Sequence, residues 1–131
     1  MPLLICMEGN MKILETEIDF DFYDAEQMQK FDIGSNEIIE GINSIKSEKM
    51  KQSEFITKFC SIIEGGFDKI FGKGTSGKIF KQKRNFKLCV QAFRDLVKER
   101  KNQEKEIDDE IRALQNEIQM ISYDYSTERI K

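Results

Sequence analysis

The first part of the chain combines a strand-like pattern with the start of a helix. Between residues 12 and 23 apolar and acidic residues alternate, and from Ile18 to Phe22 every second side chain is apolar. A period of two places the apolar groups on one face of a strand. Asp24 has the side chain of a helix N-cap, and Gln27 follows three residues later, as in a capping box. The sequence therefore predicts an N-terminal strand or hairpin that leads into a helix.

Two helices are predicted after Asp24. The first carries apolar residues at spacings of three and four as far as Ile45, and Gly34 with Ser35 is expected to break or kink it. The second spans about residues 48–71 and has two adjacent apolar stripes, which make too wide a face for a surface helix. We expect it to be the central core element, followed by a loop at residues 72–77.

The last predicted helix has the most regular pattern. Asn85 is a candidate N-cap, and the apolar residues after it follow at alternating steps of four and three, which is a heptad pattern. The apolar positions are Phe86, Val90, Phe93, Val97, Ile107, Ile111, Leu114, Ile118 and Ile121, and the pattern is interrupted by Arg100 and Glu104. Such a helix would extend about 54 Å, at about 1.5 Å per residue, which is more than a small domain covers.

Three arrangements of this helix are open. Residues 86–97 are expected to pack on the core, whereas residues 105–121 need another cover. They fold back over the chain's own strand and first helix, pair with a second copy as a homo-oligomeric coiled coil, or bind a helix of another protein. The predicted fold is mainly α with a short N-terminal β-strand or hairpin, a helical bundle with a long coiled-coil-like C-terminal helix. We divide it into an N-terminal extension (1–10), a helical core (11–101), and the distal part of the long helix with its tail (102–131).

The composition is that of a small soluble protein. The 131 residues suffice for one domain, and no apolar stretch approaches the roughly 18–20 residues of a membrane span. The apolar run at the start (MPLLICMEGN) is short for a signal peptide and lacks a cleavage site, so Met11 is a more natural start. Cys60 and Cys89 lie inside apolar helical patterns and predict reduced, buried thiols. We therefore expect a cytoplasmic protein that is not bound to a membrane.

The chain contains no histidine, which removes the commonest general base and the commonest metal ligand. Its three cysteines have no zinc-binding spacing. Carboxylate pairs such as Asp108 and Asp109 are explained by the solvated face of a helix. The sequence predicts a non-enzymatic protein with no catalytic residue, cofactor or metal.

Charge is distributed in blocks along the chain. Residues 15–40 hold nine acids and one base (−8), residues 46–101 six acids and fifteen bases (+9), and residues 102–131 eight acids and four bases (−4). Such blocks favour internal complementarity, or two faces of opposite sign and head-to-tail association. The basic residues at 81–87 could touch phosphates, but the chain is acidic overall and has no nucleic-acid-binding motif, so nucleic acid is not the expected partner. An acidic face that mimics nucleic acid is an alternative, with the residues Glu15, Glu17, Asp19 and Asp21.

Residues 72–78 (GKGTSGK) match the first seven positions of a phosphate-binding P-loop. A P-loop also needs a hydroxyl for magnesium at the next position, which is Ile79 here. It follows a buried strand, whereas this segment follows a helical pattern that ends at Phe71. We interpret the segment as a structural loop and not as a nucleotide-binding site.

Three segments together carry a resemblance: IDFDFYDAEQMQKF at residues 18–31, FDKIFGKGTSGKIF at 67–80 and NFKLCVQAFRDL at 85–96. Their order and spacing resemble those of a family of small tail assembly chaperone-like proteins, encoded in the structural-gene region of tailed phages and prophages of low-GC Gram-positive bacteria. The resemblance covers about residues 12–101, and the chain departs from it over residues 1–10 and in the polar stretch SIKSEKMKQSEF. It implies a role and no catalytic site.

The resemblance implies that the protein assists tail assembly in the cytoplasm of a bacterial host cell. It would bind its clients, the helical tape-measure protein or tail-tube subunits, and keep them soluble. The apolar heptad positions of its last helix would cover the apolar stripes of the client helices. One alternative is a small phage-encoded inhibitor of a host defence enzyme, similar to an anti-CRISPR protein, which would use the acidic face. Another is a structural tail component. The predicted partner-binding residues are Phe86, Val90, Phe93, Ile107, Ile111, Leu114 and Ile118, the first three of them expected in part in the core.

Overall fold

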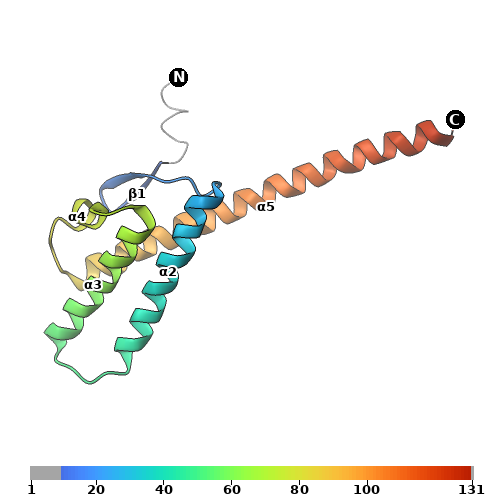
Figure 1. The fold of residues 1–131 in the computed structure, drawn as a ribbon. Coiled ribbons are helices and arrows are strands. Elements are labelled where there is room, and N and C mark those ends of the chain that lie inside the picture. Colours follow the sequence, from blue (N-terminus) through green and yellow to red (C-terminus); the bar gives the residue numbers. More distant parts are fainter. Residues whose placement is uncertain (1–9, 131) are drawn as a thin grey trace. The chain divides into compact units, whose positions relative to one another are not determined.

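The computed structural model describes residues 10–130, with side chains from residue 11 to residue 122. The elements of this part, in chain order, are β1 (Asn10–Ile13), β2 (Thr16–Asp19), α2 (Ala25–Lys46), α3 (Gln52–Phe71), α4 (Thr75–Phe80) and α5 (Phe86–Ile130). The fold is mainly α, with an N-terminal hairpin and a long C-terminal helix, as predicted (Figure 1). The chain divides into two compact units at the peptide between Glu99 and Arg100.

β1 and β2 form an antiparallel hairpin with one apolar face. Met11 lies opposite Ile18 in the register, and both side chains are buried. The alternation continues beyond β2 through Phe20 and Phe22, which are also buried. The predicted inward apolar face is confirmed, but the strand expected over residues 12–23 is a hairpin and an extended segment.

The turn of the hairpin is held by the first part of α5. Leu14 has a φ of 55°, a left-handed conformation that costs a non-glycine residue about 1–2 kcal/mol. Its N–H donates a hydrogen bond to Asp95 Oδ2 at 2.9 Å, and Gln91 Nε2 donates to Asp95 Oδ1 at 2.8 Å. One carboxylate therefore joins the turn to α5. Of the extension predicted at residues 1–10, residues 1–9 lie outside the described part, and Asn10 belongs to β1.

Both predicted N-caps are confirmed. Asp24 Oδ2 accepts the N–H of Gln27 at 3.0 Å at the start of α2. Gln27 Oε1 accepts the N–H of Asp21 at 2.9 Å, so the reciprocal bond goes to a residue three positions before the cap. Asn85 Oδ1 accepts the N–H of Leu88 at 3.1 Å at the start of α5. Side chains that accept these N–H groups satisfy donors that a helix start leaves without a partner.

α2 and α3 lie side by side and approach each other at glycines (Figure 1). A Cβ atom added at Gly34 would lie 2.4 Å from Ile70 Cγ1, and one added at Gly66 would lie 2.2 Å from Ile38 Cγ1. Ile38 and Ile70 are themselves buried. The break predicted at Gly34 and Ser35 is wrong, because α2 is continuous and Gly34 is needed for close packing.

Phenylalanine rings join the hairpin segment to this helix pair. Phe22 packs edge-on against Phe31 of α2, with ring centroids 5.4 Å apart, and Phe20 against Phe71 of α3 at 5.0 Å. Edge-to-face pairs of this kind are favourable beyond the area they bury. α3 is the central core element, as predicted, and its buried residues are Phe59, Cys60, Ile63, Gly66, Phe67 and Ile70.

We predict that Gly66→Ala destabilises the protein and that Gly65→Ala stabilises it. The methyl group added at Gly66 would overlap buried Ile38, and overpacking of this kind costs about 1–3 kcal/mol. A Cβ at Gly65 would have no atom within 4 Å, so alanine there adds only helix propensity, up to about 1 kcal/mol. Urea unfolding followed by far-UV circular dichroism measures both changes. An increase in stability of both variants would contradict the close approach of α2 and α3.

Candidate protein-binding surfaces

The second unit carries a row of exposed apolar side chains on α5. Their exposed fractions are 49% at Ile111, 54% at Leu114, 52% at Ile118 and 59% at Ile121. Ile107, which is half-buried, continues the row toward the start of the unit. Steps of three and four place all five residues on one side of the helix. We refer to Ile107, Ile111, Leu114, Ile118 and Ile121 as the apolar stripe.

Acidic residues border the apolar stripe on both sides. In the heptad, Glu110 and Glu117 lie along one side of the stripe and Asp108 lies along the other. Arg112, the one basic residue of residues 107–122, lies further round the helix from the stripe. Its Nη1 pairs with Asp109 Oδ1 at 3.7 Å. The surface is therefore an apolar row with negative borders, a form that suits contact with a helix of another chain.

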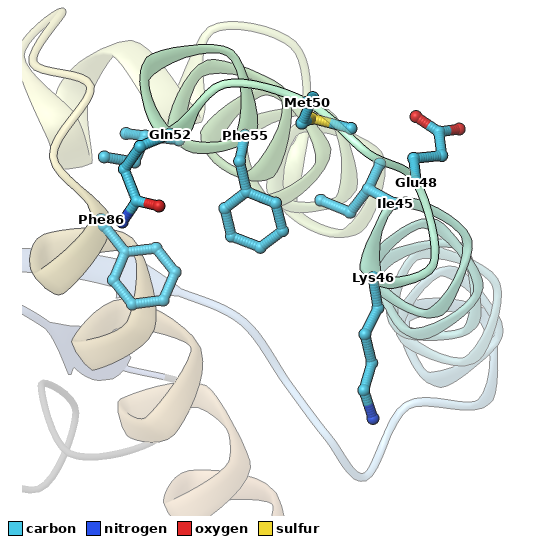
Figure 2. Close-up of a pocket in the computed structure, with 8 residues that line it drawn as sticks. Ile45, Lys46, Glu48, Met50, Gln52, Phe55 and Phe86 are labelled. Atoms are coloured by element: carbon cyan, nitrogen blue, oxygen red, sulfur yellow. The ribbon is translucent and has the colours of Figure 1, made fainter.

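A second apolar surface lies in the first unit, between the α2–α3 connection and the first turn of α5. It is a pocket of about 290 Å³, and its apolar lining is Ile45, Met50, Phe55, Ile56 and Phe86. Figure 2 shows the rings of Phe55 and Phe86 together on one side and Ile45 and Met50 across from them. Phe86 also packs on Phe59, with ring centroids 4.7 Å apart. The volume is at the lower limit of small-ligand pockets, about 300 Å³, and suits an apolar side chain of a partner.

The residues predicted to bind a partner lie in three environments. Phe86 is 39% exposed and lines the pocket. Val90 and Phe93 are half-buried against the core of the first unit. The other four predicted residues, Ile107, Ile111, Leu114 and Ile118, belong to the apolar stripe. The first part of α5 thus contributes to the core, which was expected of residues 86–97.

Sequence reasoning missed the pocket. Ile45 ends one helix pattern, Phe55 begins the next and Phe86 begins the last, so no local motif joins them. The weak signal was the width of the apolar face of the second predicted helix, which is larger than one packing partner needs. Such a signal indicates extra apolar surface but not its location.

The hairpin does not present an uninterrupted acidic face. Three of the four acidic residues predicted there are exposed, namely Glu15, Glu17 and Asp19. Lys12, however, lies directly opposite Glu17 in the register. Asp21 is half-buried, and its Oδ1 accepts the N–H of Tyr23 at 2.9 Å. A base across the hairpin and this local hydrogen bond weaken the negative field that a nucleic-acid mimic would need.

Residues 72–74 of the GKGTSGK segment form a turn between α3 and α4, and residues 75–78 already belong to α4, so the loop predicted over residues 72–77 is shorter than expected. Asp68 holds this turn. Asp68 Oδ1 accepts the N–H of Ser76 at 2.8 Å, and its Oδ2 accepts the Ser76 hydroxyl at 3.0 Å. Gly72 and Gly74 have φ values of 113° and 93°, which glycine adopts without steric cost. The Asp68 carboxylate thus already accepts the hydrogen bond of the Ser76 N–H, a donor that a bound phosphate would need. The glycines serve the geometry of this turn.

Cys60 of α3 and Cys89 of α5 are neighbouring thiols in the core of the first unit. Both are free and fully buried, as predicted. Burial, and next to it the hydrogen bond with the Cys60 thiol, raise the pKa of Cys89 far above its ordinary value. A protonated thiol without access to solvent is a poor nucleophile and a poor metal ligand. The pair therefore belongs to the packing of the core.

Neither a metal-binding cluster nor a membrane-spanning helix occurs in the part of the chain that the structure describes. Among them, no three histidine, cysteine, aspartate or glutamate side chains come together in a way that could hold a metal ion. Over residues 10–130, no helix combines the length and the apolar composition that crossing a membrane requires.

These features define a small α-helical protein with an N-terminal β-hairpin and exposed apolar surfaces in both of its units. The chain belongs to the family of unknown function DUF6673, whose sequence profile matches residues 14–129. The match includes β2, the helices of the first unit and the apolar stripe. No curated protein and no solved structure matches the chain.

We predict that Cys89 makes the protein less stable above about pH 9. In the unfolded chain the thiol ionises near its ordinary pKa of about 8.5, whereas the folded protein holds the proton at higher pH. The folded state then binds more protons, so the free energy of unfolding falls by up to about 1.4 kcal/mol per pH unit. Urea unfolding at about pH 8 and about pH 10 measures this fall, and Cys89→Ala should reduce it. Equal falls in both proteins would contradict the assignment to Cys89.

Proposed function

We propose that the protein is a non-enzymatic binding protein that uses the apolar stripe to cover an apolar helix of another protein. The observation that carries this proposal is the row of four large apolar side chains on one side of α5, each 49% to 59% exposed. Single exposed apolar residues are common on protein surfaces, but a continuous row marks an interaction surface. A row at heptad spacing has the geometry that pairs with another helix.

More specifically, we propose a tail assembly chaperone of a tailed phage or prophage. The support for this role is the resemblance of residues 18–31, 67–80 and 85–96 to chaperone-like proteins of such phages. The client is a tape-measure or tail-tube protein in the host cytoplasm. Its apolar helical surfaces have to be covered until the client polymerises. The stripe binds these surfaces and releases them when tail subunits compete for the same contacts.

The size of the stripe suits reversible binding. Full burial of an isoleucine or leucine contributes about 1.5–3 kcal/mol, so covering five partly buried side chains of the stripe and about five of the partner contributes roughly 1 kcal/mol from each, about 10 kcal/mol in all. Association costs at least about 4 kcal/mol in lost freedom of motion, and more where side chains become ordered. The balance is at most about 6 kcal/mol, a Kd of about tens of micromolar or weaker, which a polymerising tail can overcome, as a chaperone requires.

We predict that Ile111→Asp combined with Leu114→Asp abolishes client binding, because two carboxylates would be desolvated in an apolar interface. The measurement is a pull-down of the tagged protein from the lysogen, induced and uninduced, with mass spectrometry of the captured proteins. Tape-measure or tail-tube protein should be recovered only after induction, and only with the unchanged stripe. Asn116→Asp combined with Gln119→Asp is the matched control, since it adds two carboxylates outside the stripe.

Two results would count against the proposal. Client binding that survives the double change in the stripe, with helix content unchanged by circular dichroism, would exclude the stripe as the binding surface. Recovery of a host defence enzyme, lost in a variant with Glu17→Lys and Asp19→Lys, would identify the protein as an inhibitor that acts through its hairpin.

A further inference from the structure

We infer that the partner of the apolar stripe is a basic amphipathic helix, one whose own apolar stripe is bordered by lysine or arginine. The inference rests on the proposed function and adds the chemical class of the partner. It depends on the charges beside the stripe, on the position of the nearest base and on the poor fit of a second copy.

The heptad assigns the border residues. Ile111 and Ile118 occupy a positions, and Ile107, Leu114 and Ile121 occupy d positions. The g positions beside them are Glu110 and Glu117, and the e positions are Asp108, Gln115 and Ser122. All five border residues are exposed. In paired helices the e and g side chains meet those of the partner and select it by charge.

The borders carry negative charge only. Residues 107–122 hold four acids and one base, a net charge of −3. The base, Arg112, occupies a b position, and its guanidinium pairs with Asp109 on the side away from the stripe. No ion pair neutralises Glu110 or Glu117 among the side chains of residues 11–122. The field at the stripe therefore attracts cationic side chains.

A second copy of the chain does not supply such side chains. In a parallel pair each g residue meets the e residue five positions later on the partner, so Glu110 faces Gln115 and Glu117 faces Ser122. In an antiparallel pair the g positions of the two copies share one side, which brings the glutamates together. Neither pairing contains an attractive border contact, and the second contains like charges.

A basic amphipathic helix supplies both apolar side chains for the stripe and positive charges for its acidic borders. Its apolar stripe covers the isoleucines and leucine, and lysine or arginine at its e and g positions reaches Glu110, Glu117 and Asp108. Exposed ion pairs of this kind are individually weak, about 0.2–1 kcal/mol each. Three of them together favour a lysine border over a glutamate border by about tenfold or more in affinity, because the glutamate border adds repulsion.

The test measures binding of the full-length protein to two synthetic helical peptides of about four heptads. Both peptides carry the same leucine and isoleucine stripe, and their e and g positions are all lysine in one and all glutamate in the other. Fluorescence anisotropy at low salt should show the lysine peptide binding about tenfold more tightly or better. The difference should shrink as salt is added, because salt screens exposed charges.

Charge reversal provides the matched comparison. Glu110→Lys combined with Glu117→Lys should invert the preference, so that the glutamate peptide binds more tightly. Asn116→Lys combined with Gln119→Lys adds two positive charges outside the borders and should leave the preference for the lysine peptide in place.

The possible failures are distinguishable. Equal binding of both peptides, abolished by Ile111→Asp with Leu114→Asp, would overturn the inference and leave the proposed function standing. Failure of the protein to bind either peptide would overturn the proposed function as well. A dimer in sedimentation experiments that the same double change dissociates would assign the stripe to a second copy, which also overturns the inference.

Discussion

The close approach of α2 and α3 at Gly34 and Gly66 is the constraint on which the first unit depends. Each glycine lowers helix propensity by about 1 kcal/mol relative to alanine, so a helix pair would not use them without a compensating gain. The gain is the space that Ile70 fills against Gly34 and Ile38 fills against Gly66, where a Cβ atom would overlap. With the helices this close, apolar side chains from both belong to one continuous core.

The remaining elements attach to this helix pair by apolar faces and are fixed by hydrogen bonds at their turns. The hairpin segment adds phenylalanine rings to the core, and its turn is held by the carboxylate of Asp95. Asp68 holds the turn between α3 and α4 in the same way, through the amide and hydroxyl of Ser76. Both carboxylates accept N–H groups that a turn leaves without a backbone partner. Packing thus supplies most of the cohesion of this unit, and these two acids fix where its turns lie.

Local signals in the sequence were sufficient for much of this fold. Alternating residues predicted the hairpin face, and the capping side chains of Asp24 and Asn85 marked where α2 and α5 begin. Gly34 was misread because helix propensity describes one helix by itself, whereas the reason for this glycine lies on α3. The pocket around Phe86 was missed for a similar reason, since its walls come from distant segments. The heptad pattern predicted the stripe, but no pattern in one chain states what covers it.

The acidic borders of the stripe can have two effects at once. An apolar row at heptad spacing is a surface on which copies of the same chain associate, and such association would occupy the surface before any partner arrives. Glu110 and Glu117 oppose the antiparallel form of this pairing, in which the glutamates of the two copies meet, and they gain no attractive contact in the parallel form. The same charges attract a helix with basic borders, so the surface discriminates between partners by repulsion as well as by attraction. For the proposed chaperone, this would keep the stripe accessible in the absence of the client. Part of the binding free energy of the client would then come from exposed ion pairs. Such pairs contribute less than buried apolar contacts, which favours release.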